Sequence, residues 1–307
     1  MNADIFLKVL YAVLETFAFY GLGAYLVIRK MLDGESIKGM SRFAIHTLTP
    51  FLIFSSITGN FTRADLTTAW IYPVMGFGMM VLHCIFGYLL MILRHNTRER
   101  RATFLHMAVV NNYLYLPLIV IGHLWDGKTM AALMLWSVGA TFGQWTLGIA
   151  VMAGNDIKRM LRTLVSSNSI AVIAAVLYLL QDYRLPGQCM NFMTKTGSLA
   201  IPLCLIFIGA SLYLSRTRFT SHLWDVLTGT LIRVLVIPMM TLILLRYLPL
   251  PEMARNIATV IAVMPGSSGS VLIMREYGGD VDFAGQRIIV TTIASLITMP
   301  VLLAFCL

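Results

Sequence analysis

The sequence predicts an all-α integral membrane protein with ten transmembrane helices, arranged as two inverted five-helix repeats with broken helices 4 and 9 crossing each other. Three observations predict this fold class. Hydrophobic residues make up 58% of the 307 residues and charged residues only 12%, whereas about 25% of an ordinary soluble domain is charged. Apolar stretches near the ~20 residues that a spanning helix needs fill almost the whole chain. Similar segments also recur half a chain apart.

Ten apolar stretches are long enough to cross a bilayer as helices. The first is too long for the core of a signal peptide and follows Asp4 rather than a basic stretch, so we expect it to remain in the mature protein. Together they leave no room for a soluble catalytic domain. The predicted spans are residues 5–28, 41–58, 70–93, 103–122, 129–152, 164–181, 195–214, 224–247, 255–274 and 284–306.

The net charge of +9 is divided unevenly between two sets of loops. The loops after odd-numbered spans hold 15 Lys and Arg residues, whereas the N-terminal end and the loops after even-numbered spans hold seven. Cytoplasmic loops carry the excess of basic residues in membrane proteins. The odd-numbered loops are therefore predicted to face the cytoplasm of a bacterial inner membrane, with both termini in the periplasm. The basic excess reports orientation and does not require a nucleic acid partner.

Metal sites and disulfides are not predicted. The four cysteines show neither CxxC pairs nor Cys/His ligand spacing, and three histidines of the spans have no common spacing. We therefore expect no metal and no cofactor. The residues are Cys84, Cys189, Cys204, Cys306, His46, His83 and His106.

The two halves of the chain contain matching landmarks at a nearly constant offset. Pro50 and Pro202 lie 152 positions apart in similar segments, Trp70 and Trp224 lie 154 apart, and so do Asp126 and Asp280. We therefore divide the chain into repeats at residues 1–153 and 154–307. Because each repeat has five spans, the second must enter the membrane from the opposite side. Inverted repeats of this kind are typical of secondary transporters, whose substrate sites lie at mid-membrane between discontinuous helices.

Spans 4 and 9 each contain residues that interrupt a helix at the same repeat position. Proline lacks an N–H group and clashes with the preceding turn, and in hydrocarbon irregular backbone is tolerated only where it faces protein or a wet cavity. Half-helix N-termini at such a cavity favour an anion, and amide and hydroxyl side chains could bind carboxylate oxygens. The candidate substrate-binding residues are Asn111, Asn112 and Pro117 in span 4, and Pro265, Gly266, Ser267 and Ser268 in span 9.

Three segments resemble the auxin efflux carrier family, which includes plant auxin carriers and bacterial carriers of malonate and other organic acids. They are "MPGSSGSVLIMREYGGDVDFAGQRIIVTTIASLITMP" at 264–300, "TPFLIFSSI" around Pro50 and "NNYLYLPL" from Asn111. The resemblance covers essentially the whole chain, and its C-terminal part is the most specific. In the family the asparagine usually stands slightly further from the proline than Asn111 stands from Pro117. Either Asn111 or Asn112 could therefore have its role.

The resemblance also implies a domain organisation and a substrate class. It implies a scaffold domain of spans 1, 2, 6 and 7, a transport domain of spans 3–5 and 8–10, and a small organic anion as substrate. The partners that we consider are this anion, the lipid bilayer and a second copy of the chain, in a homodimer through the scaffold domain. Since the family also uses its fifth helix at the site, we add Thr141 and Gln144, which share one helix face; interhelical hydrogen bonding is the alternative.

Two charged residues within the spans are further candidates. Glu15 lies in the middle of span 1, where a carboxylate costs about 3 kcal/mol on insertion scales. It could take up a proton and couple transport to a proton gradient, or pair with a neighbouring helix. Arg233 in span 8 could be its partner or attract an anionic substrate. We favour a third interpretation for Arg233, snorkelling to the interface, because it lies about two turns from the start of its span.

We therefore predict a secondary transporter of a small mono- or dicarboxylate that works by alternating access around the helix crossing. The first alternative is a sodium-coupled symporter of the bile-acid type, which shares the inverted-repeat, NhaA-like architecture. A non-transporting membrane sensor is a weaker alternative. An intramembrane enzyme is disfavoured because the sequence has no HExxH motif, paired DxxD acids or membrane histidine with a catalytic partner. The sequence also has no nucleotide-binding loop, so we expect no direct coupling to ATP.

Overall fold

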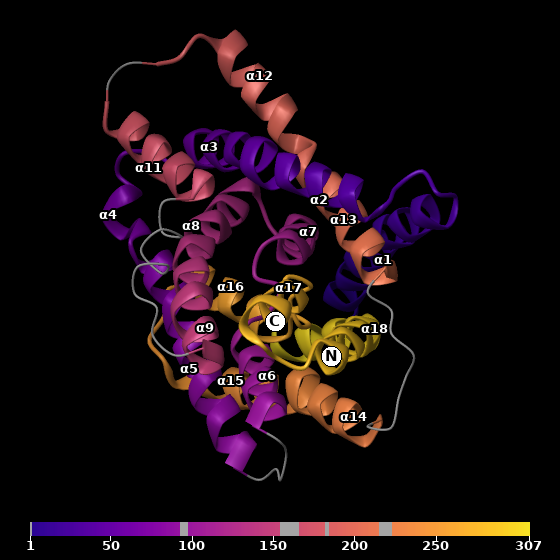
Figure 1. The fold of residues 1–307 in the computed structure, drawn as a ribbon. Coiled ribbons are helices and arrows are strands. Elements are labelled where there is room, and N and C mark those ends of the chain that lie inside the picture. The colour runs from indigo at the N-terminus through magenta and orange to yellow at the C-terminus, as the bar shows by residue number, and fades with distance from the viewer. Residues whose placement is uncertain (1, 93–97, 154–165, 182–183, 215–222) are drawn as a thin grey trace.

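The computed structural model describes residues 2–92, 98–153, 166–181, 184–214 and 223–307, and the regular elements in these ranges are helices (Figure 1). Some basic loop residues that support the predicted orientation lie outside them, namely Arg94, Lys158, Arg159, Arg162, Arg216 and Arg218. The first half contains α1 (Ala3–Ile28), α2 (Gly34–Phe43), η1 (Ala44–Leu48), α3 (Thr49–Asn60), α4 (Leu66–Ala69), α5 (Ile71–Ile92), α6 (Arg98–Val109), α7 (Tyr115–Leu124), α8 (Gly127–Gly143), η2 (Gln144–Gly148) and α9 (Ile149–Ala153). The second half contains α11 (Ser167–Leu180), α12 (Gly187–Ser198), α13 (Ala200–Leu214), α14 (Leu223–Leu231), η3 (Ile232–Val236), α15 (Ile237–Tyr247), α16 (Glu252–Ala262), α17 (Ser270–Tyr277) and α18 (Val281–Cys306).

Helices occupy all ten of the ranges predicted to span the membrane, within the described residues. Among the described residues, five helical stretches are both long and apolar enough to cross a bilayer: Ala3–Ile28, Leu66–Met91, Gly187–Leu214, Leu223–Tyr247 and Val281–Cys306. The second predicted span begins seven residues earlier than expected, at Gly34. Its polar first turn is stabilised by the Asp33 side chain, whose Oδ1 accepts the Ser36 N–H at 2.8 Å.

Glycines bring two helix pairs into close backbone contact. A Cβ on Gly23 of α1 would lie 1.9 Å from the Ile206 carbonyl oxygen of α13, and one on Gly209 would lie 2.3 Å from Tyr20. In the same way, Gly76 of α5 and Gly139 of α8 face the backbone of each other's helix. Small residues at such contacts are the usual means by which helices associate in lipid. The pairs α1–α13 and α5–α8 are therefore closely packed units.

Three long helices contain a π-helical turn: η1 joins α2 to α3, η2 joins α8 to α9, and η3 joins α14 to α15. Proline follows two of these turns, Pro50 after η1 and Pro238 after η3. Because proline cannot donate the hydrogen bond that continues an α-helix, a wider turn accommodates it. The sequence analysis did not predict these turns.

Both chain ends lie at the same end of the helix bundle. The Asn2 N–H donates to the Ala304 carbonyl oxygen at 2.8 Å, so the start of α1 lies beside the end of α18. Figure 1 marks both ends close together near α17 and α18. A chain that crosses the membrane an even number of times has this arrangement.

Candidate functional site at the crossing of two broken helices

The predicted breaks in spans 4 and 9 are confirmed, and they meet each other. Non-helical backbone separates α6 from α7 and α16 from α17. Asn111 and Gly266 form an antiparallel bridge, and the Asn112 N–H donates to the Pro265 carbonyl oxygen at 3.0 Å. The bridged residues stand 155 positions apart, within one residue of the repeat offset found in the sequence. The crossing thus satisfies backbone groups that would otherwise be unpaired in the membrane.

A cavity of about 650 Å³ lies against the crossing. Six of the predicted substrate-binding residues line it: Asn111, Asn112, Thr141, Gln144, Ser267 and Ser268. The other three do not. Pro117, Pro265 and Gly266 are buried behind it, where they shape the two breaks. The remaining wall comes from residues that were not predicted to belong to the site, namely Ser41, Ile45, His46, Tyr113, Leu114, Tyr115, Ser137, Trp145, Ser166, Ser167, Asn168, Cys204, Ile208 and Gly269.

The two adjacent asparagines differ in their surroundings. Asn111 is 1% exposed, and its Nδ2 donates to the Ile261 carbonyl oxygen near the end of α16 at 2.8 Å. The Asn112 side chain is half-buried at the cavity and has no hydrogen-bond partner within the described part of the chain. Asn111 therefore joins the two broken helices, while the Asn112 amide remains available to a ligand.

Two tyrosines of the first break extend the polar wall. The Tyr113 hydroxyl shares a 3.2 Å hydrogen bond with Thr141 Oγ1 of α8, and the Tyr115 hydroxyl shares one of 3.1 Å with Thr49 Oγ1 of α3. Thr141 is thus both a cavity residue and an interhelical contact. Neither tyrosine was among the predicted site residues, although Tyr113 and Tyr115 alternate with Leu114 in "NNYLY", which is the period of an extended segment with two faces.

His106 connects three elements behind the cavity. Its Nδ1 donates to the Gly148 carbonyl oxygen of η2 at 2.6 Å, and its Nε2 lies 3.2 Å from Ser270 Oγ at the start of α17. The histidine is fully buried. It therefore fixes the second half of broken helix 9 against α6 and the η2 turn.

The structure corrects the preferred interpretation of Arg233. Its side chain does not snorkel: it is 1% exposed and binds the backbone at the crossing, with Nε and Nη2 donating to the Met264 carbonyl oxygen and Nη1 donating to that of Ala108. Glu15 is not its partner, because Glu15 Oε2 lies 3.4 Å from His123 Nε2 on an exposed part of α1. Neither side chain lines the cavity.

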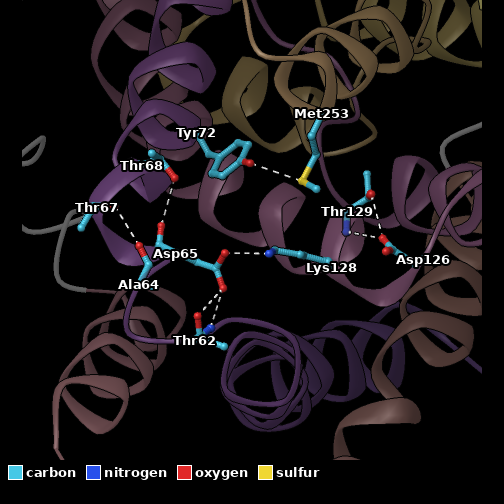
Figure 2. Close-up of polar contacts among 10 residues, drawn as sticks. All are labelled: Thr62, Ala64, Asp65, Thr67, Thr68, Tyr72, Asp126, Lys128, Thr129 and Met253. Atoms are coloured by element: carbon cyan, nitrogen blue, oxygen red, sulfur yellow. Dashed lines mark hydrogen bonds and ion pairs between the residues drawn. The ribbon is translucent and has the colours of Figure 1, made fainter.

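A polar cluster joins the segment between α3 and α4 to the N-terminal end of α8 (Figure 2). Lys128 Nζ donates to Asp65 Oδ1 at 2.6 Å, and the Thr62 N–H and hydroxyl donate to Asp65 Oδ2. These hydrogen bonds lower the pKa of Asp65 to about 2, and Asp65 in turn raises the pKa of Lys128. Beside this pair, Gly127 packs so closely on Asn60 that a Cβ would lie 2.5 Å from its Oδ1.

The chemistry available at the cavity is that of hydrogen-bond donors and helix N-termini. Neither α7 nor α17 has a side chain capping its N-terminus, and Tyr115 and Gly269 at these ends line the cavity. Helix N-termini attract negative charge. Within the described ranges no three His, Cys, Asp or Glu side chains are grouped as a metal site would need. The site is therefore suited to a polar or anionic small molecule.

Comparison with known proteins adds two findings. The sequence profile of the family described as membrane transport protein matches residues 8–159 and 155–303. An "uncharacterized transporter" of Methanothermobacter thermautotrophicus (strain ATCC 29096 / DSM 1053 / JCM 10044 / NBRC 100330 / Delta H) is 24% identical over 306 residues, a match that covers 96% of this chain and 98% of that protein.

Proposed function

The chain belongs to the membrane transport protein family of auxin efflux carriers, and from this premise we propose that it is a secondary carrier of a small organic anion. The transported class is a mono- or dicarboxylate of about the size of malonate. It binds at the crossing of the two broken helices, and access alternates between the two sides of a bacterial inner membrane.

The cavity at the crossing is the observation that carries this proposal. Its volume of about 650 Å³ lies within the range of small-molecule sites. The Asn112 amide and the hydroxyls of Ser267 and Ser268 are donors on its wall, and α7 and α17 direct their N-terminal ends toward it. Donors and positive dipole ends without a carboxylate among the cavity-lining residues favour an anion over a cation.

The position of the cavity supports an inward-facing state. Its wall reaches Ser41 in α2 and Ser166 before α11, next to the loops that the distribution of Lys and Arg assigns to the cytoplasm. At the other ends of spans 2 and 5, Gly127 packs against Asn60, and Lys128 pairs with Asp65 (Figure 2). In the transport cycle these outer contacts separate while the inner opening closes, by an elevator-like or rocking movement.

We propose the division into a scaffold domain and a moving transport domain that the family resemblance implies. Spans 1, 2, 6 and 7 form the scaffold, which is supported by the packing of α1 on α13 and of α3 on α11 and α12. Spans 3–5 and 8–10 form the transport domain, which is supported by the packing of α5 on α8 and of α14 on α18. Both termini face the periplasm, and a homodimer forms through the scaffold.

Ligand-induced stabilisation of purified protein tests the proposed substrate class. A carboxylate at about 100 times its Kd stabilises the folded state by about 2.7 kcal/mol, which a thermal-shift screen of mono- and dicarboxylates detects. Asn112→Ala and Ser267→Ala should lose most of this shift. Ser198→Ala, which removes an exposed hydroxyl on α12, should keep it.

Uptake into proteoliposomes then tests transport and coupling. We expect the stabilising carboxylate to be accumulated, with the same rate when sodium is replaced by potassium. Loss of uptake without sodium would identify a symporter of the bile-acid type instead. If no carboxylate stabilises the protein, or if both cavity variants respond like the parent, the proposed site and substrate class are wrong.

A further inference from the structure

Arg233 lies at the place where the C-terminal ends of two broken helices meet. Ala108, whose carbonyl oxygen accepts from Nη1 at 3.0 Å, is in the last turn of α6. Met264, whose carbonyl oxygen accepts from Nε at 3.2 Å and from Nη2 at 3.0 Å, is two residues beyond α16. One guanidinium therefore bonds to both half-helices.

Helix C-termini expose carbonyl groups without intrahelical partners and carry partial negative charge. Two such ends close together inside a membrane protein would repel each other, and their carbonyls would lack partners. A planar guanidinium with several donors can satisfy both ends at once, which a lysine ammonium does less well. This is a physical reason for an arginine at this position.

The charge of Arg233 is not cancelled by an acidic side chain in the described part of the chain, where its partners are carbonyl oxygens and His83. Nη1 lies 3.5 Å from His83 Nδ1, which must accept, so this contact calls for a neutral imidazole. A whole positive charge is therefore buried at the crossing. From Met264 the backbone continues to Pro265, whose carbonyl accepts the Asn112 N–H next to the cavity.

We propose that Arg233 is the positioning residue of the anion site: it holds the two broken helices at the crossing and makes the site prefer negatively charged ligands. Its contact with substrate is indirect, through the backbone that it holds and through its field. The half-helix N-termini at the cavity then remain for the anion, while the opposing C-terminal ends are neutralised by the protein. The preference for anions rests on the proposed function, whereas the holding role does not.

Arg287 provides a matched control. It is also a fully buried arginine with carbonyl partners, since Nη2 donates to Gly229 and Nη1 to Phe104. Its partners lie in α14 and in the middle of α6, away from the crossing. Replacing Arg287 removes a buried guanidinium that also donates to two backbone carbonyls, and these carbonyls do not belong to the helix ends that meet at the crossing.

Hydrogen exchange in lipid nanodiscs tests the holding role without any ligand. In Arg233→Met, backbone amides of residues 109–114 and 264–270 should exchange at least about ten times faster than in Arg287→Met, because hydrogen bonds to charged groups are lost there. Arg233→Lys should give an intermediate increase. If Arg233→Met does not purify as a folded protein, Arg233→Lys is compared with Arg287→Lys instead. If the amides of these two segments exchange equally fast in Arg233→Met and in Arg287→Met, or in the two lysine variants, the proposal is wrong.

Binding of a charged and a neutral ligand tests the preference for anions. Malonate and its uncharged diamide have similar size, and their affinities are compared by calorimetry. Arg233→Met should bind malonate about ten times more weakly, as expected for loss of one nearby unit charge, with little change for the diamide. Arg233→Lys, which keeps the charge, should stay within about threefold of the wild type.

The two failures can be told apart. If the wild-type protein binds no carboxylate, the proposed function fails, and the exchange measurement still decides whether Arg233 holds the crossing. If the wild type binds malonate and Arg233→Met binds it equally well, the electrostatic role of Arg233 is wrong while the proposed function stands.

Discussion

At the residue scale, neighbouring side chains in the first break have opposite surroundings. Both asparagines line the cavity, but Asn111 is buried and bonded to the end of α16, whereas the half-buried Asn112 side chain has no hydrogen-bond partner in the described part of the chain. The sequence analysis found both residues but could not separate their roles, because a single chain does not reveal which face of an extended segment is turned to the other broken helix. The antiparallel bridge between Asn111 and Gly266, which are half a chain apart, determines which face of the segment is turned to the other broken helix.

Replacing each asparagine by alanine should therefore have different effects. Asn111→Ala removes the side-chain hydrogen bond to the Ile261 carbonyl oxygen, which keeps its backbone donors, the N–H groups of Val263 and Met264. We therefore expect the free energy of unfolding to fall by about 1 kcal/mol, the net contribution of one hydrogen bond. Asn112→Ala should leave the stability of the ligand-free protein within about 0.5 kcal/mol of the parent. Thermal unfolding of both variants in detergent measures this. A larger loss for Asn112→Ala would show that the two roles are reversed.

The two charged candidates illustrate a limit of hydropathy arguments. Position along a span suggested that Arg233 reached the interface, whereas the structure buries it inside the bundle. Glu15 lies in the middle of its span but on an exposed face of α1, where it contacts His123 of the neighbouring helix α7. Depth in a sequence window says nothing about helix rotation, and rotation places Glu15 on an exposed face of α1 and Arg233 inside the bundle. Which face is buried depends on the packing partners, which a single sequence does not reveal.

At the element scale, the interruptions were the most predictable feature. Proline, glycine and asparagine mark local backbone requirements that can be recognised without knowledge of packing, and the breaks in spans 4 and 9 are where these residues predict. The early starts at Gly34 and Gly187 were missed because the first turns of α2 and α12 are polar and extend beyond the apolar windows. The contact surfaces of the helices were also not predicted.

Two glycines of α5 provide a test of those contact surfaces. A Cβ on Gly76 would lie 2.2 Å from the Trp136 carbonyl oxygen of α8, so Gly76→Ala should force the helices apart and lower stability by about 1–3 kcal/mol. Gly78 is on the exposed face of the same helix with open space around it. Gly78→Ala should leave the melting temperature unchanged or raise it slightly. Equal effects of the two substitutions would contradict the close α5–α8 contact.

At the scale of the whole molecule, composition was sufficient to identify a multi-pass membrane protein, and the resemblance of its motifs was sufficient to identify the family. The cavity was not predictable as a shape. Its wall combines the two breaks with Ser41, His46 and Ser167 from distant elements, and only the assembled bundle brings these together. The predicted orientation and the division into scaffold and transport domains stay predictions.

A native cysteine allows the orientation to be measured. Cys189 is exposed at the start of α12, next to a loop predicted to face the periplasm. An impermeant maleimide should label the protein in sealed right-side-out vesicles, and Cys189→Ser should abolish this labelling. A cysteine introduced at exposed Ser36 in Cys189→Ser should react only after the membrane is opened. The opposite pattern would place both termini in the cytoplasm.

The antiparallel bridge between Asn111 and Gly266 also has a consequence for how this protein can vary. Extended backbone turns successive side chains to opposite sides, so one residue inserted between Asn111 and Asn112 would put a new side chain at the cavity position of Asn112 and turn Asn112 to the other side. The same insertion would shift the partner of the Pro265 carbonyl. A substitution in one of the breaks changes the contacts of one side chain, whereas an insertion changes which residues of the two breaks lie opposite each other. In engineered variants of this chain, insertions and deletions within the two breaks should therefore be tolerated less well than substitutions.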